Sequence, residues 1–359
     1  MLRNIGYKLT SFLVLFFDFC LAAYLPEKIS SYPCLLSLRK IWDQAPHSAF
    51  TDLIFYRDKF FCVFREADTH AGGADGVIRI LASEDGSEWQ SVSTLKLSGI
   101  DLRDPHFSIM QDGRLFLIMG GSVYQDEKLL THRPYVTFSN DGVHWTPIEK
   151  TDLEREWVWR VTWCGEIGYG MSYRLTDLED IEKPWLLKLF KTTDGINYQY
   201  VTRLDVSSYP SEATVRFLPD DTMVALVRRD GNGWIGSAKA PYRQWNWKEI
   251  GYRLGGPNFL ILPDGQMWAA SRLVKVIDEK TKETSTILAH MSLKEYEPLL
   301  QFPSGGDTSY PGMVYRNGKL YISYYSSHEG KSAIYFAEVG FLPFNINNLG
   351  FGFFFLKKT

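Results

Sequence analysis

The chain has 359 residues, a formal net charge of -3 at pH 7 and a sequence pI of about 6.2. Because it has no excess of basic residues to neutralise phosphates, it does not have the composition of a general nucleic-acid or membrane-surface binder, and we expect no nucleic-acid partner. Aromatic residues make up 15% of the chain, a share that favours strands over helices and supplies flat faces suited to sugar rings.

The first segment in chain order is an apolar run with basic residues near its start. Residues 1–23 combine Arg3 and Lys8 with a long apolar stretch and small residues at its end, which is the layout of a secretory signal. Asp18 interrupts the run, so an uncleaved anchor is the competing interpretation. We expect a secreted or periplasmic protein with no membrane-spanning segment beyond this one.

Three cysteines remain outside that segment. Cys34, Cys62 and Cys164 are an odd number without C-x-x-C spacing, which predicts neither a disulfide framework nor a zinc site. We therefore expect buried thiols, and we expect no cofactor. A metal is the alternative, because His47, His70, His106 and His328 lie near the predicted mouth, although their spacing is not diagnostic of a metal site. At the other end of the chain, residues 342–359 are apolar and aromatic but too short and too interrupted to span a bilayer, and their role is left open.

The body of the chain, residues 36–341, repeats one pattern about every fifty residues. Each unit starts with two short strands joined by a tight turn, and in three units a third strand then leads into an Asp-Gly phrase, namely SEDGSEW, SNDGVHW and TTDGINY. Three later units keep the first half: SEATVRFLPDDTMVALVRR, GPNFLILPDGQMWAASR and TSYPGMVYRNGKLYISYY. Asp-Gly or Asn-Gly between alternating apolar runs is a strong hairpin signal.

These six units predict an all-β fold, a six-bladed β-propeller, in which each blade buries its faces against its neighbours. The last unit has three clear strands. Residues 36–44, LSLRKIWDQ, are expected to supply its fourth strand and so to close the ring. A β-sandwich or two stacked β-domains is the competing architecture.

Polar residues are expected to converge on one mouth of this propeller. In an antiparallel blade the innermost strand begins on the rim where the second strand ends, and the turn between them lies on the opposite rim. Guanidinium groups bind carboxylates through paired hydrogen bonds, so the expected partner is a small acidic sugar or an acidic glycan. The candidate binding residues at these strand ends are Arg65, Arg103, Arg160, Arg229, Arg272, Asp52, Asp104, His106 and His328. Some of these arginines must instead pair with neighbouring acidic residues.

The repeated phrase, S-x-D-G-x-x-W, resembles the Asp-box (BNR repeat) of the sialidase, or neuraminidase, superfamily, although the usual motif has one more residue before the Trp. The resemblance covers roughly residues 45–340 and implies a six-bladed β-propeller of the sialidase type. In that family the Asp-box is structural: its Asp and its Ser or Thr hold backbone amides of the turn, and its aromatic residue packs into the blade. It follows that Asp85, Asp141 and Asp194 are poor catalytic candidates.

Other segments resemble those that carry the family's catalytic groups. SYPGMVYRNGKLYISYY is similar to the segment of the Tyr nucleophile, which matches Tyr310. SEATVRFLPDDTMVALVRR is similar to the segment that contains a Glu and a binding Arg, matching Glu212 and either Arg229 or Arg228. The loop in FREADTHAGGADGVIRILASEDG is similar to the one whose Asp acts as acid and base, which matches Asp75. Asp68 is the rival of Asp75 for this role.

The first blade departs from the family pattern. Sialidases open this blade with Arg-Ile-Pro, whose Arg helps to bind the sialic acid carboxylate, whereas this chain has AFTDL, with Thr51 and Asp52 near that place. Arg65 and Arg103 are the candidates to replace the missing guanidinium group. Arg272 stands where a third binding Arg could fall.

The resemblance implies an exo-α-sialidase-like glycoside hydrolase that releases a terminal acidic sugar. Tyr310 would be the nucleophile, Glu212 would take its proton, and Asp75 would protonate the leaving oxygen and then activate water. Two alternatives remain: a polysaccharide lyase for uronic-acid glycans that uses His106, His328 and Tyr310, and a noncatalytic propeller that binds acidic carbohydrate. The sequence leaves open the sugar, its linkage and the oligomeric state.

Overall fold

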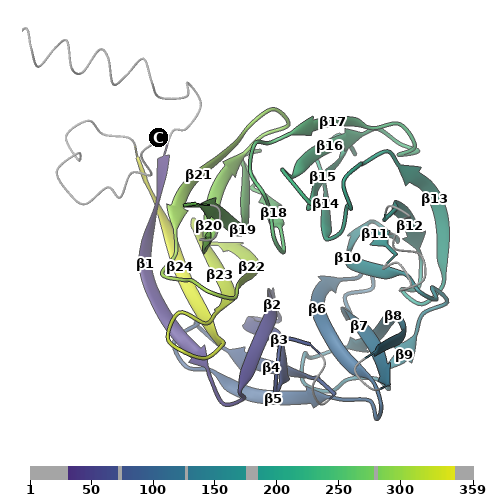
Figure 1. The fold of residues 1–359 in the computed structure, drawn as a ribbon, viewed down its shortest axis with the longest axis horizontal. Coiled ribbons are helices and arrows are strands. Elements are labelled where there is room, and N and C mark those ends of the chain that lie inside the picture. Colours follow the sequence, from purple (N-terminus) through teal and green to yellow (C-terminus); the bar gives the residue numbers. More distant parts are fainter. Residues whose placement is uncertain (1–30, 72–74, 126–127, 175–184, 279–281, 344–359) are drawn as a thin grey trace, which may run out of the picture. The chain divides into compact units, whose positions relative to one another are not determined.

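The computed structural model describes residues 31–71, 75–125, 128–174, 185–278 and 282–343. The described residues form 24 strands in six four-stranded antiparallel sheets, and these ranges contain no helix. Figure 1 shows the six sheets as blades arranged around a common axis. The predicted all-β, six-bladed propeller is therefore confirmed.

The chain divides into two compact units. One, Cys34–Gly340, contains the blades. The other consists of residues 1–33 and 341–359. The predicted signal at 1–23 and nearly all of the C-terminal segment at 342–359 lie outside the described residues. A search of the described part of the chain finds no helix long and apolar enough to cross a membrane.

Each blade runs from an inner strand near the axis to an outer strand at the periphery (Figure 1). The strands of blades 1 and 2 are β2 (His47–Tyr56), β3 (Lys59–Ala67), β4 (Val77–Ser83), β5 (Gln90–Leu95), β6 (Asp101–Ile109), β7 (Leu115–Gln125), β8 (Lys128–Ser139) and β9 (Glu149–Lys150). Those of blades 3 and 4 are β10 (Trp157–Cys164), β11 (Ile167–Tyr173), β12 (Leu187–Thr192), β13 (Tyr198–Leu204), β14 (Ala213–Phe217), β15 (Met223–Val227), β16 (Trp234–Ala238) and β17 (Asn246–Glu249). Blades 5 and 6 contain β18 (Asn258–Ile261), β19 (Met267–Val276), β20 (Lys282–Met291), β21 (Tyr296–Gln301), β22 (Thr308–Arg316), β23 (Lys319–Ser326), β24 (Ala333–Pro343) and β1 (Ser31–Trp42).

The ring closes through strand β1, which is hydrogen-bonded to β24 as the outer strand of blade 6. This is the strand that residues 36–44 were expected to supply. The chain then enters blade 1, where the Ser48 amide donates to the Ser332 carbonyl of blade 6 at 3.2 Å. Segments from the two ends of the described chain therefore share one sheet.

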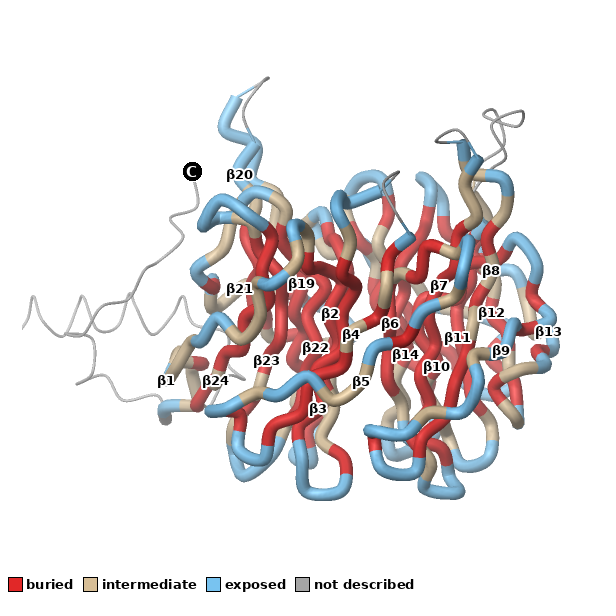
Figure 2. The backbone as a smooth tube through the Cα atoms, turned by 90° about the horizontal axis from the view of Figure 1, so that it is seen from below, coloured by how far each residue is buried: buried red, intermediate tan, exposed pale blue. Residues whose placement is uncertain are grey.

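The hairpin turns and the repeated phrases lie on the same rim. Tyr56, at the end of β2, donates its hydroxyl to the carbonyl of Gly113 in the blade 2 turn (2.8 Å) and to that of Asn140 in the SNDGVHW phrase (3.1 Å). Figure 2 shows loops at the lower edge of the blades as exposed, below strands that are largely buried. The opposite rim is consequently the place where inner strands begin.

Hydrogen bonds within the SNDGVHW phrase confirm that it is a structural turn. The Oγ of Ser139 accepts the Gly142 amide at 2.8 Å, and Oδ1 of Asp141 accepts the amides of Val143 and His144, both at 2.8 Å. A side chain at Gly142 would meet the Phe61 ring of the preceding blade, and the φ of 78° there also favours glycine. The phrase thus repeats because each blade docks on its neighbour in the same way.

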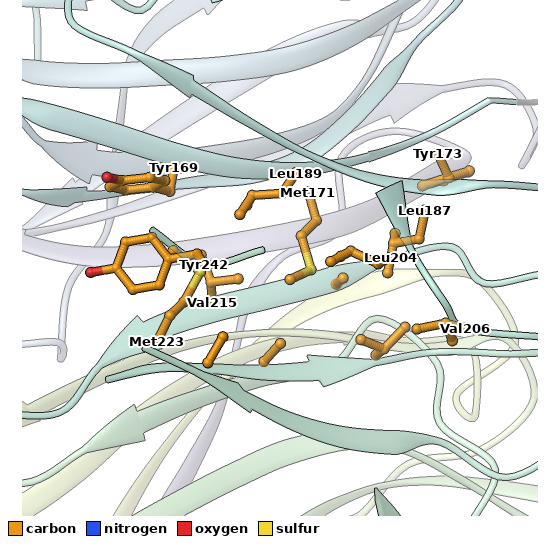
Figure 3. Packing of buried hydrophobic residues seen from close by; sticks show 14 of the residues in the cluster. Tyr169, Met171, Tyr173, Leu187, Leu189, Leu204, Val206, Val215, Met223 and Tyr242 are labelled. Carbon is orange, nitrogen blue, oxygen red and sulfur yellow. The ribbon is translucent and has the colours of Figure 1, made fainter. Parts of the chain in front are cut away.

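Apolar side chains fill the space between neighbouring blades, as Figure 3 shows for blades 3 and 4. Met171, Leu187 and Leu189 of blade 3 pack with Val215 and Met223 of blade 4, and all five are fully buried. Burial of such a side chain contributes roughly 1.5–3 kcal/mol. The blades hold one another in place, which leaves the inner strand ends available for polar groups.

The expectation of buried thiols is correct for one cysteine only. Cys62 in β3 is buried, whereas Cys34 and Cys164 are half-buried, and all three are free. Cys34 and Cys164 lie at the outer strand β1 and at the end of β10, where packing is incomplete.

Candidate active site

A cavity of about 160 Å³ lies among inner strand starts and second strand ends, the positions expected to form the mouth. Its ionisable groups apart from tyrosine are His70, Arg103, Asp104 and Glu212. Aromatic rings form much of the remaining wall: Phe50, Tyr124, Trp157, Tyr173 and Tyr310. Such a wall suits the apolar faces of a sugar ring.

β-Bulges at the mouth aim several of these side chains. The inner strands of blades 1, 2, 3 and 6 each change register near their start. Phe50, Asp104 and Tyr310 have φ values of 61°, 46° and 54°, a backbone conformation that non-glycine residues seldom adopt. Strained positions of this kind concentrate at functional sites.

Tyr310 and Glu212 are in direct contact. The Tyr310 hydroxyl donates to Oε1 of Glu212 at 2.6 Å, and both residues are buried. Burial raises the pKa of Tyr310 well above its ordinary value, and the charges of Glu212 and Asp104 raise it further. A phenol in this position needs a base in contact with it, and Glu212 is placed to be that base.

Glu212 is held in its ionised form. Burial favours the neutral acid, but Arg228 donates to Oε1 at 2.5 Å and the Gly256 amide donates to Oε2 at 2.6 Å. Together with the Tyr310 hydroxyl, these donors outweigh burial and lower the pKa of Glu212 below its ordinary value.

Of the two arginines that match the family's binding Arg, Arg228 contacts Glu212. The guanidinium of Arg229 instead lies 4.2 Å from the ring centroid of Trp234 and 3.7 Å from Oε2 of Glu249. Both arginines follow the end of β15 at Val227, and neither is part of the cavity lining.

Asp104 brings a second carboxyl group to the cavity. Its Oδ2 accepts the indole N–H of Trp157 at 3.1 Å. Burial raises the pKa of Asp104 to about 6, and the charge of Glu212 also raises it, while Arg103 opposes this shift. The cavity therefore contains one carboxyl group that is stabilised as the anion and one that is not.

Phe50 of blade 1 and Arg103 of blade 2 are in contact in the wall of the cavity. Phe50, in the segment AFTDL, packs against Tyr310 with ring centroids 4.9 Å apart. The guanidinium of Arg103 lies 5.3 Å from the Phe50 ring centroid and donates to the His70 carbonyl at 2.7 Å. Of the two proposed replacements only Arg103 lines the cavity, since Arg65 is fully buried and binds Asp101 at 2.8 Å.

Three candidate binding residues form a buried network outside the cavity lining. Arg160 donates from Nη1 to Oδ2 of Asp52 at 2.8 Å and from Nη2 to Oδ1 at 3.0 Å, and Nη2 also lies 3.0 Å from Nδ1 of His106. Asp52 and His106 are each 1% exposed. The structure places Asp52, Arg160 and His106, which were predicted to bind substrate, outside the cavity lining, where they contact one another inside the protein.

Three more candidates lie away from the cavity lining. Asp75 is exposed, and its Oδ2 accepts the Gly99 amide at 2.9 Å. Arg272 has Nη1 3.9 Å from Oδ1 of Asp307. His328 contacts Ser326 Oγ through Nδ1 at 2.8 Å and packs on a tyrosine of blade 6.

Among the described residues, one group of side chains has the donor atoms for a metal ion. Ligand atoms of His47, His70 and Asp307 lie within 4.8 Å of one another. Oδ2 of Asp307 is 3.3 Å from Nε2 of His47 and 2.8 Å from Nδ1 of His70. Although burial acts to raise the pKa of Asp307, these two imidazoles outweigh it and lower that pKa. Both imidazoles thus contact the same carboxylate oxygen, while Nδ1 of His47 is buried without a hydrogen-bond partner among the described residues.

Trp157 and Tyr173 line the cavity but were not selected as binding residues from the sequence. Both stand at strand ends of blade 3, β10 and β11, so the rule that selected charged residues at those ends would also have found these aromatic ones.

No protein-family model matches the chain, and no curated protein matches it. Several solved structures share its fold. A protein of unknown function from Dyadobacter fermentans aligns with a TM-score of 0.71 at 16% identity, over 86% of this chain and 99% of that one. Trypanosoma rangeli sialidase in complex with sialic acid aligns with a TM-score of 0.63 at 12% identity, over 88% of this chain and 58% of that one.

An α-L-arabinofuranosidase from Fusarium graminearum, in complex with an iminosugar inhibitor, aligns with a TM-score of 0.60 at 14% identity, over 85% of this chain and 97% of that one. The present chain spans only 58% of the length of the sialidase. At these identities the likeness establishes the architecture, a six-bladed propeller of the sialidase type, which is the fold that the repeats predicted.

Proposed function

We propose that the protein is a retaining exo-glycoside hydrolase with Tyr310 as nucleophile and Glu212 as its base. The observation that carries the proposal is the 2.6 Å hydrogen bond between the Tyr310 hydroxyl and Glu212 in the wall of the cavity. A nucleophile and a base within hydrogen-bond reach, with the base oriented by a third group, is the arrangement of covalent catalysis. Arg228 is that third group.

The chemistry follows from the charges of this group. As the Tyr310 oxygen bonds to the anomeric carbon, its proton passes to Glu212 and the glycosidic bond breaks. A neutral phenol approaches an acidic sugar without the repulsion that a carboxylate nucleophile would meet. Arg228 keeps Glu212 ionised until the proton arrives. Two solved structures with this fold are a sialidase and an arabinofuranosidase, both of which are glycosidases by name, and this also supports the class of reaction.

The size of the cavity supports action at a chain end. Its volume of about 160 Å³ is below the roughly 300–1,000 Å³ of sites for drug-sized ligands, so it suits one sugar ring. Arg103 is the guanidinium on its wall that is available to a carboxylate, and we propose a terminal acidic sugar as substrate. Because the first-blade segment AFTDL contains no arginine, this sugar is held with fewer cations than the family pattern implies.

The positions of the two histidines named for the lyase alternative favour hydrolysis over elimination. His70 does line the cavity, but its Nδ1 contacts Asp307. His106 is buried against Arg160, and His328 does not line the cavity, so neither is placed to remove a proton from a bound uronate. For a secreted or periplasmic glycosidase we expect a glycan substrate outside the cytoplasm.

Incubation with a panel of sialosides, uronosides and arabinofuranosides, followed by mass spectrometry, tests the proposal. We expect a free sugar that carries the mass of one added water. Tyr310→Phe should abolish its release without lowering the melting temperature by more than a few degrees. Tyr173→Phe is the matched control, because Tyr173 also lines the cavity while the hydrogen bond to Glu212 comes from Tyr310.

Three outcomes would contradict the proposed reaction. Full turnover by the Tyr310→Phe variant would rule out Tyr310 as the nucleophile. Products that absorb as unsaturated uronates would show elimination. Binding of the panel without any product over long incubation would support the noncatalytic alternative instead.

A further inference from the structure

The two carboxyl groups of the cavity differ in how well their oxygens are satisfied. Glu212 accepts three hydrogen bonds, from Tyr310, Arg228 and Gly256. Within the described residues, the carboxyl group of Asp104 accepts a single hydrogen bond, from Trp157. A buried carboxylate usually accepts two or more, so Asp104 is an unusual acid in this protein.

The backbone of β6 directs Asp104 to the cavity. The strand changes register between Arg103 and His106, and Asp104 has a φ of 46° within this bulge. The bond from the Trp157 indole fixes Oδ2, which leaves Oδ1 as the oxygen without a partner in the described part of the protein. The side chain lines the same cavity as Tyr310 and Glu212.

We propose that Asp104 is the acid and base of the reaction. The resemblance to the sialidase family implies this role for Asp75 instead. This inference rests on the proposed function. In the first step Asp104 gives its proton to the leaving oxygen as that oxygen's bond to the anomeric carbon breaks, and the Tyr310 oxygen bonds to this carbon. In the second step Asp104 takes a proton from water, the water oxygen bonds to the carbon, and Tyr310 leaves and regains its proton from Glu212.

The electrostatics of the cavity support two separate roles. The charged groups that act on Asp104 are Arg103 on its own strand, Arg65 and His70 of blade 1, and Glu212 of blade 4. Burial and Glu212 together overcome the three cationic groups, so the pKa of Asp104 rises to about 6. Glu212 is shifted in the opposite direction. Carboxyl groups whose environments push their pKa values apart are how one site holds both an acid and a base.

Asp75 is less suited to this role in the structure. Its carboxylate accepts the Gly99 amide and is exposed, and it does not line the cavity. Asp101, the other acid nearby, is bound by Arg65. Asp104 and Glu212 are therefore the two acids on the cavity wall as the described residues form it.

The test compares Asp104→Asn with Asp75→Asn on two glycosides of a sugar that the wild type releases, one with an alkyl and one with a 4-nitrophenyl leaving group. Loss of a general acid typically lowers the rate about 100- to 10,000-fold. We expect this loss for Asp104→Asn on the alkyl glycoside and a much smaller loss on the 4-nitrophenyl glycoside, because nitrophenolate leaves without protonation. Added azide should restore turnover of the latter and yield the glycosyl azide. Asp75→Asn should behave as the wild type.

A second measurement needs no substrate. Carbon-13 NMR of aspartate carboxyl groups in the full chain should show one group that titrates near pH 6 in the wild type and in Asp75→Asn but is missing from Asp104→Asn. Melting curves check that each variant is folded.

The outcomes separate the two proposals. An Asp104→Asn variant with wild-type rates on the alkyl glycoside, or a wild type in which Asp104 titrates near pH 4, would overturn the role of Asp104. Loss of activity in Tyr310→Phe alongside either result would leave the proposed function standing. A wild type that releases no sugar from the whole panel would contradict the proposed function itself.

Discussion

Two buried groups of charged residues near the mouth look alike in sequence but differ in the structure. The first, the floor network, consists of Asp52, Arg160 and His106, and its members bind one another. The second, the cavity group, contains Glu212 and Asp104, and the latter has an oxygen without a partner among the described residues. Both come from inner strand starts. The comparison shows that neither charge nor position at a strand start decides whether an acid lines the cavity or lies in a buried network.

The floor network should give the largest loss of stability. Arg160→Met leaves the Asp52 carboxylate buried without its two guanidinium bonds, and breaking a buried pair in this way costs about 3–5 kcal/mol. Urea unfolding of the variant should show this drop in the free energy of unfolding. The double variant Arg160→Met/Asp52→Leu is the control, because removing both charges should recover much of the loss. An unchanged midpoint in the single variant would mean that these two bonds do not stabilise the folded protein.

His106 makes the floor network sensitive to acid. Burial and the charge of Arg160 lower the pKa of His106 to about 4. Because the folded-state pKa lies below the ordinary value near 6.5, the unfolded state binds the proton first, and stability falls as the pH drops from about 6.5 to 4. The shift corresponds to roughly 3 kcal/mol. Unfolding free energies of His106→Gln and wild type, compared between pH 7 and 4, should converge as the pH falls.

The contribution of Asp104 to stability should depend on pH in the opposite direction. Its raised folded-state pKa means that its contribution to stability is present below about pH 4 and is lost as the pH rises through about 6. Asp104→Asn should therefore be more stable than the wild type at pH 7.5, by up to roughly 2–3 kcal/mol, and should lose this advantage near pH 4. A variant less stable than the wild type at both pH values would show that Asp104 is a structural residue, like the members of the floor network.

The sequence predicted the architecture because the repeat encodes it locally. Asp-Gly and Asn-Gly turns mark the hairpins, and residues 36–44 supply the closing strand. The phrase with Asp141 could be recognised as structural because all of its partners lie within a few residues along the chain.

The sequence could not predict which charges at the mouth face the cavity. The inference from strand ends assumes regular alternation of side chains, but β2 and β6 have bulges at these positions. An extra residue in a strand moves every later side chain to the other face. Asp52 and His106 follow the bulges and are buried, whereas Asp104 lies within one and reaches the cavity. Segment resemblance found Tyr310 and Glu212, whose contact joins residues far apart in the chain.

Substitutions in the repeated turns should cause the smallest loss of stability, and they test whether burial matters. Asp141 is as well satisfied as Asp52, since Oδ1 accepts two backbone amides at 2.8 Å, but its side chain is 45% exposed. Water can replace lost bonds there, so Asp141→Ala should cost only about 1 kcal/mol. Asp85 accepts the one amide of Ser87, and Asp85→Ala should cost less. If the two variants melted as far below the wild type as Arg160→Met, saturation alone would govern stability and burial would not be needed to explain the floor network.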